Sequence, residues 1–151
     1  MEREHLDLLA VYGDREHSAN LCYLTGFDPR FEEALLLLDR TGARLLLVGN
    51  ECMGYLPDPG LRMPAVLFQP FSLMGQPRGD SRPLREIFTD FGLHAGARVG
   101  CIGWKCYGAP LVDGGECASD LPAYIVDTLR ELTADPRRVV NATHLFTHPE
   151  Q

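Results

Sequence analysis

The chain of 151 residues is long enough for one domain that buries about 70% of the surface its unfolded chain exposes. It carries 14 Lys and Arg against 21 Asp and Glu, and this net charge of -7 argues against nucleic acid or an anionic membrane as a partner, because both reward clustered positive charge. No apolar run approaches the ~20 residues that span a bilayer. The first residues lack signal-peptide character, so we expect a cytoplasmic protein.

The five cysteines bear on metal binding and on the cellular compartment. An odd number of cysteines without a signal peptide favours free thiols in a reducing environment. Cys101, Cys106 and Cys117, taken with His94, offer ligands for zinc, but the close-pair spacing of structural zinc sites is missing. We therefore interpret the cysteines as small buried hydrophobic residues and assign no metal ligand to the chain.

An apolar run and a helical segment begin the chain. Leu6–Tyr12 is mostly apolar and ends at a Gly-Asp pair, which is a turn signal, so we predict the first strand there. The segment Ser18–Leu24 predicts a short helix, and the hydroxyl of Ser18 can cap its first turn.

Two further apolar runs predict a hairpin. Glu33–Leu38 and Ala43–Val48 are joined by a short linker of Asp, Arg, Thr and Gly, which favours an antiparallel turn. Their near-continuous apolarity indicates burial on both faces of a sheet. Leucine is also a good helix former, but the length of the runs and the turn residues favour strands.

The remaining elements follow from similar patterns. Apolar spacing predicts helices over Asn50–Leu56, Pro83–Phe91 and residues 120–132, with Asn50 and Asp120 as caps. Short apolar runs predict strands over Ala65–Phe68, Arg98–Trp104 and Val139–Asn141.

The stretch Gln69–Pro83 contains several prolines and glycines and predicts a long loop. A loop of this length in a compact domain is usually functional or disordered. Phe71, Leu73 and Met74 lie within it, and a disordered linker rarely holds three large apolar residues so close together. We therefore expect these residues to be exposed and to dock another domain or subunit.

Helices and strands alternate after the hairpin, and this order predicts an α/β fold with three layers and a mixed β-sheet. Residues 1–151 are expected to form a single domain. The sequence stops soon after a predicted strand and without a closing helix, so we expect it to have been cut from a longer protein at a domain boundary.

Catalytic motifs are missing from the sequence. His144 and His148 have helical spacing, but no Glu follows His144 and Pro149 abuts the second histidine, so a solvated terminus is the better interpretation. No Gly-x-Ser-x-Gly segment is present. The glycines of residues 100–104 lie within a strand pattern and lack the order of a phosphate-binding loop. We therefore predict no catalytic residue and no cofactor site in this chain.

The segment from Asn20 to Ala34 is the most informative part of the sequence. Gly26 permits backbone angles that other residues avoid, and Pro29 disfavours helix in the residue before it. The segment therefore predicts an irregular connection that displays side chains, and binding residues are often found on such connections.

Several side chains of this segment are suited to binding. Tyr23, Phe27, Arg30 and Phe31 would supply ring faces and one cation for a small substrate that carries a carboxylate. The alternative is that Tyr23 and Phe27 belong to the core and that Arg30 is solvated. Glu32 and the glutamate after it are more typical of a solvated strand start than of general acids.

The order of motifs resembles a known family. The pattern Asn20-x-x-Tyr23-Leu24-Thr25-Gly26-Phe27, followed by the hairpin, resembles the N-terminal domain of the creatinase and prolidase (Xaa-Pro aminopeptidase) family. The segments Arg98–Gly103 and Asn141–Thr143 are similar to the final third of that domain. The resemblance covers nearly the whole chain and implies a ribonuclease-H-like α/β domain.

The resemblance also implies parts that this chain lacks. In the family, a C-terminal pita-bread catalytic domain follows, and in the peptidases two Asp, one His and two Glu bind a pair of metals such as Mn, Co or Zn. None of these ligands can be mapped onto the present sequence. Family members are usually homodimers, in which the N-terminal domain of one subunit helps to close the active site of the other.

The resemblance implies roles for the residues discussed above. Arg30, Phe31 and Glu32 correspond by position to the segment that closes the site in creatinase, where an arginine follows the phenylalanine, whereas acids follow Phe31 here. This difference argues against a creatine-like substrate. Tyr23 and Phe27 are further candidates for substrate gating, and the loop residues that we expect to be exposed are interface candidates.

We therefore predict a non-catalytic N-terminal domain that serves dimerisation and substrate gating in a metal-dependent aminopeptidase or dipeptidase. Its partners would be its own catalytic domain, a second subunit, and a peptide or small-molecule substrate. The alternative is a stand-alone α/β domain that binds a small ligand or a protein partner without peptidase activity.

Overall fold

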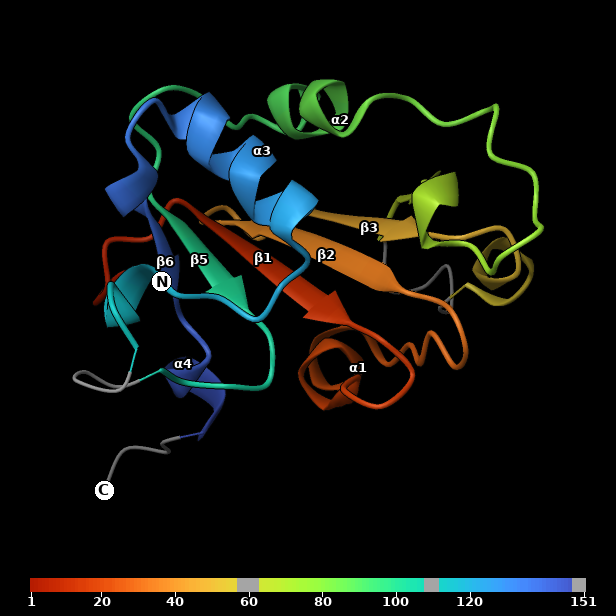
Figure 1. Cartoon of the computed structure of the whole chain (residues 1–151), viewed down its shortest axis with the longest axis horizontal. Coiled ribbons are helices and arrows are strands. Elements are labelled where there is room, and N and C mark those ends of the chain that lie inside the picture. The colour runs from red at the N-terminus through yellow and green to blue at the C-terminus, as the bar shows by residue number, and fades with distance from the viewer. Residues whose placement is uncertain (57–62, 108–111, 148–151) are drawn as a thin grey trace.

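The computed structural model describes residues 1–56, 63–107 and 112–147. Its centre is a six-stranded sheet in the order β4-β3-β2-β1-β5-β6 (Figure 1). Pairs β1–β2 and β2–β3 are antiparallel and the other pairs are parallel, so the predicted mixed sheet is confirmed. The strands are β1 (Leu8–Gly13), β2 (Ala34–Asp39), β3 (Arg44–Val48), β4 (Ala65–Leu67), β5 (Val99–Ile102) and β6 (Val139–Asn141).

Helices cover both faces of the sheet, which confirms the three predicted layers. Helices α2 (Leu84–Asp90) and α3 (Ala123–Thr133) lie on one face, and α1 (Ala19–Thr25) and α4 (His144–Thr147) lie on the other (Figure 1). The short α4 differs from the irregular tail that the sequence predicts, and His148 lies outside the described residues. No described helix has the length and apolarity needed to cross a bilayer.

The β2–β3 hairpin shows why its sequence is almost continuously apolar. Leu35 and Leu37 pack in the core beneath α2 and α3, whereas Leu36 packs in the core on the α1 side, and all three are fully buried. Because successive side chains of a strand point to opposite faces, a strand covered on both faces needs apolar residues at every position. The prediction of strands rather than helices is therefore confirmed.

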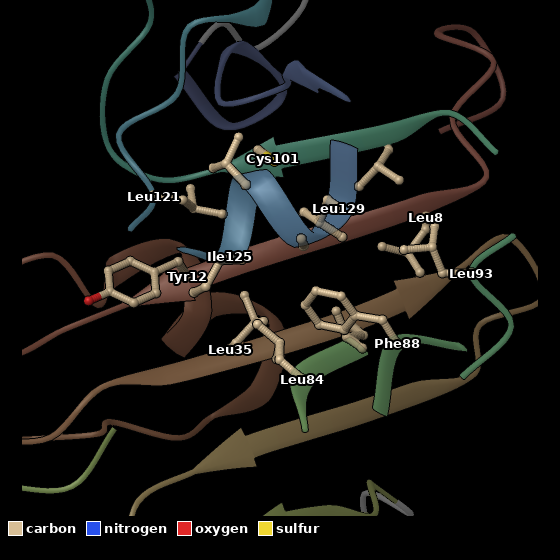
Figure 2. Packing of buried hydrophobic residues seen from close by; sticks show 14 of the residues in the cluster. Leu8, Tyr12, Leu35, Leu84, Phe88, Leu93, Cys101, Leu121, Ile125 and Leu129 are labelled. Carbon is tan, nitrogen blue, oxygen red and sulfur yellow. The ribbon is translucent and has the colours of Figure 1, made fainter. Parts of the chain in front are cut away.

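The larger core lies between the sheet and the helices α2 and α3. Phe88 of α2 and Ile125 and Leu129 of α3 point toward β1 and β2 (Figure 2). The helix predicted over residues 120–132 is thus present as α3, with Ile125 and Leu129 buried in the core. Cys101 of β5 is completely buried in the same core, and burial raises the pKa of its thiol to about 12.

The cysteines differ in exposure. Cys52 is fully buried, like Cys101, and burial raises the pKa of its thiol to about 12. Cys106 is exposed, so the interpretation of every cysteine as a buried hydrophobic residue is wrong for this one. Cys22 and Cys117 are partly exposed.

The predicted helix caps are wrong, although the helices themselves form. Ser18 makes no side-chain bond to the first turn of α1. The Asn50 side chain donates to the carbonyl of Pro77 at 3.0 Å, and the turn that follows it is a 3-10 helix, Cys52–Tyr55. Asp120 accepts the backbone N–H groups of residues 104 and 105 at 2.7 and 2.9 Å instead of capping α3. The side chains of Asn50 and Asp120 therefore form hydrogen bonds with residues distant in the sequence, and local sequence patterns cannot reveal such partners.

Candidate functional site

The pairing of β1 with β2 brings two polar segments together at one end of the sheet. Gly13 at the end of β1 pairs with Ala34 at the start of β2, so the residues after Gly13 and before Ala34 are neighbours. With the loop that follows β4, they form a cleft of about 550 Å³, which we call the strand-end cleft. Its walls include Asp14, Phe31, Glu33, Leu73, Met74 and Arg78.

Asp14 shapes the turn that leaves β1. Its Oδ1 accepts the backbone N–H groups of Glu16 and His17 at 2.9 and 2.8 Å, and it lies 3.1 Å from Nδ1 of His17. The ring of His17 stacks on Trp104, with centroids 3.7 Å apart. This stacking holds the turn after β1 against the segment that follows β5. Asp14 was missed as a site residue, although a Gly-Asp pair at the carboxyl end of a strand is a usable signal.

Glu33 and Tyr12 form a polar pair beside the cleft. The Tyr12 hydroxyl donates to Oε2 of Glu33 at 2.7 Å; Tyr12 is buried and Glu33 is half-buried. Burial raises the pKa of Glu33, although the bond from Tyr12 opposes this rise. Burial, with the neighbouring Glu33 carboxylate, also raises the pKa of Tyr12 and of Tyr124. The expectation of a solvated glutamate is therefore wrong at position 33.

We expect Glu33→Gln to increase the free energy of unfolding at pH 7 and to leave it nearly unchanged at pH 4. A carboxyl whose pKa is higher in the folded chain stabilises the fold below its unfolded pKa of about 4.3, and this contribution is lost as pH rises through the folded pKa. Partial exposure limits the gain to about 1 kcal/mol or less. Urea denaturation between pH 4 and pH 7 measures the change, with the exposed Glu16→Gln as control. An equal effect of Glu33→Gln at both pH values would contradict the assignment.

Glu32 is a structural residue and is not displayed to solvent. It is 2% exposed, and its carboxylate accepts the backbone N–H groups of Glu51 and Cys52 at 3.2 and 2.9 Å. A Cβ atom at Gly49 would lie 2.6 Å from Glu32 Oε2, so the close approach requires glycine there. The expectation of a solvated Glu32 is wrong because the residue ties the segment before β2 to the end of β3.

Arg30 lies against an aromatic residue away from the strand-end cleft. Its backbone is left-handed, with φ 58°, and its N–H donates to Asp28 Oδ1 at 2.8 Å. The guanidinium carbon lies 5.9 Å from the centroid of the Tyr55 ring. Tyr55 in turn donates to the carbonyl of Pro29 at 3.2 Å, and Phe27 packs on its ring. Arg30 is exposed, as the alternative interpretation has it, with its guanidinium near the Tyr55 ring, and it is not among the residues that line the cleft.

The other candidates from this segment are separated. Phe31 lines the strand-end cleft and is 45% exposed, whereas Phe27 is buried in the core, as the alternative interpretation has it. Tyr23 of α1 is 81% exposed, so that alternative is wrong for it, and its ring contacts Phe146 of α4 edge-on at 6.1 Å. Of the aromatic gating candidates Tyr23, Phe27 and Phe31, only Phe31 is among the described residues that line the cleft.

The loop after β4 is an ordered wall of the cleft. The guanidinium of Arg78 donates to four backbone carbonyls, among them those of Gln69 at 3.1 Å and Ser72 at 2.7 Å. Gln69 Nε2 donates to Asn50 Oδ1 at 3.0 Å, and the Ser72 hydroxyl accepts the Asn50 N–H at 2.9 Å. The sequence did not point to Arg78, because every residue has a backbone carbonyl and bonds to carbonyls therefore leave no recognisable sequence pattern.

The apolar residues of this loop divide into two groups. Phe71 is 2% exposed and packs edge-on against Phe68 at 4.9 Å and Tyr12 at 6.4 Å. The prediction that Phe71 is exposed is therefore wrong, because this domain itself supplies the aromatic partners. Leu73 and Met74 are exposed, as predicted, at 41% and 94%. The exposed pair and Phe31 gather around one cleft.

Within residues 1–56, 63–107 and 112–147, no group of three His, Cys, Asp or Glu side chains is placed to hold a metal ion. The chemical groups of the cleft are carboxylates, two arginines and apolar side chains, which suit binding of a peptide-like molecule by contact and charge.

The comparisons with known proteins give similarity in structure alone. No protein-family model matches the sequence, and no curated protein matches it significantly. The fold resembles a proline dipeptidase from Streptococcus pneumoniae, with a TM-score of 0.57, 17% identity, and coverage of 97% of this chain and 87% of the other. A proline dipeptidase from Streptococcus agalactiae is similar with a TM-score of 0.56 and 12% identity, and the alignment covers 99% of this chain and 91% of the other.

A third similar structure is the creatinase/prolidase N-terminal domain of an X-Pro dipeptidase from Streptococcus pyogenes, with a TM-score of 0.54 and 14% identity. The alignment covers 97% of this chain and 89% of the other. Together with the sheet order and the helical layers, these similarities show that the chain has the fold of the creatinase/prolidase N-terminal domains.

Proposed function

We propose that this chain is the non-catalytic N-terminal domain of a creatinase/prolidase-like peptidase that acts on Xaa-Pro peptides. In this proposal the domain contributes to a homodimer, and the strand-end cleft forms part of the wall around a metal-dependent active site. The fold similarity to proline dipeptidases supports the proposal. It also favours this function over a stand-alone binding domain.

The gating role rests on three exposed apolar side chains around the cleft, two of which lie on the loop that Arg78 holds in place. Phe31, Leu73 and Met74 are exposed around the strand-end cleft, and such apolar clusters mark interaction surfaces. Arg78 already holds the loop in place through backbone carbonyls, so little conformational freedom would be lost on binding. A divalent ion such as Mn, Co or Zn would be held by the catalytic domain, because the described residues provide no ligand set.

The first test compares this chain with the product of its natural gene purified with all its domains. We expect hydrolysis of an Xaa-Pro dipeptide with added manganese by the complete product and none by residues 1–151 alone. Turnover by the isolated chain that scales with its concentration would contradict a non-catalytic domain. Absence of turnover by a complete product that is folded and metal-loaded would contradict the peptidase assignment.

The gating role predicts a specific effect of Met74→Ser in the complete product. The substitution removes an exposed apolar side chain from the cleft, so we expect KM to rise about fivefold while kcat changes by less than about twofold. Met53→Ser is the matched control, because Met53 is also exposed at 39% but is not among the lining residues. Equal kinetic effects of the two substitutions would contradict the role of the cleft.

A further inference from the structure

A second concave region lies at the β5–β6 edge of the sheet, away from the strand-end cleft. Two cavities of about 360 and 580 Å³ share Arg98, Tyr107 and Val140 among their walls, and neither shares a described lining residue with the cleft. Arg98 immediately precedes β5, and Val140 belongs to the neighbouring β6. The volume of the larger cavity falls within the usual range of small-molecule sites.

Arg98 is unusual among the arginines of the described chain. Its Nε atom is buried and donates no hydrogen bond, and none of the ion pairs found in the described residues includes its guanidinium. Arg130 also has a buried, unbonded Nε, but its Nη2 donates to the carbonyl of Cys117 at 2.7 Å. The exposed arginines without partners, such as Arg44, can be hydrated. Arg98 as a whole is only half-buried and lines the cavity, so the rest of its guanidinium can meet an anion there.

The charges around the larger cavity indicate what kind of anion that is. Its described charged residues are Arg98, Arg137 and Glu116. Arg137 already pairs with Asp135 through two bonds of 3.0 and 3.1 Å, and Glu116 is exposed. Arg98 is thus the one cation lining this cavity, among described residues, without a carboxylate partner. A single unpaired guanidinium suits a monoanion, and its planar fork suits a carboxylate.

We infer that the larger cavity binds a small organic carboxylate, with the carboxylate on the guanidinium of Arg98 and an apolar body against Val140 and Tyr107. The smaller cavity is a poorer place for the anion, because Glu4 and Glu116 both line it. The site is independent of the proposed peptidase role, since it uses no residue of the strand-end cleft.

Benzoate and hexanoate are suitable probes, and benzamide is the neutral counterpart of benzoate. We expect saturable binding of both carboxylates by calorimetry and by NMR shifts at Tyr107 and Val140. Benzamide should bind at least about tenfold more weakly, because it cannot form the charge-assisted bonds. Absence of saturable binding of either carboxylate, or binding of inorganic phosphate alone, would overturn the inference.

Substitution of Arg98 tests the assignment to a residue. We expect Arg98→Met to weaken benzoate binding at least about tenfold while the thermal midpoint without ligand stays equal or rises, since an unbonded buried donor is removed. If the methionine variant fails to fold, Arg98→Lys replaces it in the test. The lysine keeps the charge but not the planar fork of the guanidinium, and should weaken binding about tenfold. Arg44→Met, at an exposed arginine, should bind like the unmodified chain. Unchanged affinity in both Arg98 variants would refute the site.

Discussion

Glu32→Ala should lower the free energy of unfolding by about 3 kcal/mol. The carboxylate accepts the backbone N–H groups of Glu51 and Cys52, and the residue is 2% exposed. Its removal leaves these two backbone donors without their acceptor. For a chain of this size, the thermal midpoint should fall by about 6–12 °C.

The loss is best measured by urea denaturation, with circular dichroism to confirm that each variant is folded. Glu32→Gln keeps the volume and one acceptor but points an amide N–H at a backbone donor, so it should fall between the alanine variant and the unmodified chain. The exposed Glu16→Gln should change stability by less than about 0.5 kcal/mol. A loss for Glu32→Ala no larger than that of the Glu16 control would show that the buried carboxylate contributes nothing.

Gly103→Ala is the second substitution for which we expect a large effect, about 2–3 kcal/mol of destabilisation. A Cβ atom at position 103 would overlap Oδ1 of Asp120. Asp120 would have to move, and it holds the backbone N–H groups of Trp104 and Lys105. The methyl group therefore costs both steric strain and two hydrogen bonds.

A matched glycine separates this effect from the general cost of the substitution. Gly54 has no atom within 4 Å of the position of an added Cβ and no left-handed backbone, so Gly54→Ala should stay within about 0.5 kcal/mol. Amide hydrogen exchange provides the local readout, because the N–H groups of Trp104 and Lys105 should lose protection in Gly103→Ala alone. Equal stability of the two variants, or unchanged protection, would contradict the role of Asp120.

The strands and helices could be predicted because their determinants are local. Unbroken apolar runs with a turn between them predicted β2 and β3 correctly, and amphipathic spacing predicted α2 and α3. The fold class followed from their order, and the short Tyr-Leu-Thr-Gly-Phe segment pointed to the fold that the structural similarities show.

The partners of polar and aromatic side chains could not be predicted in the same way. Glu32 reaches N–H groups about twenty residues away, and Phe71 is covered by Tyr12 of the first strand. Phe31 and Met74 were assigned to separate surfaces because no sequence pattern joins them. The strand-end cleft joins them only after β2, β3 and β4 have paired.

The sheet order has a consequence for how the chain folds during synthesis. Strand β1 pairs with β2, which follows closely, and with β5, which begins only at Val99. The three antiparallel strands can therefore form early, but the other edge of β1 stays unpaired until the second half of the chain is made. That edge is a long apolar strand, so the nascent chain presents a template for wrong β-pairing during this interval. Slow translation between β3 and β5 should therefore promote aggregation rather than aid folding.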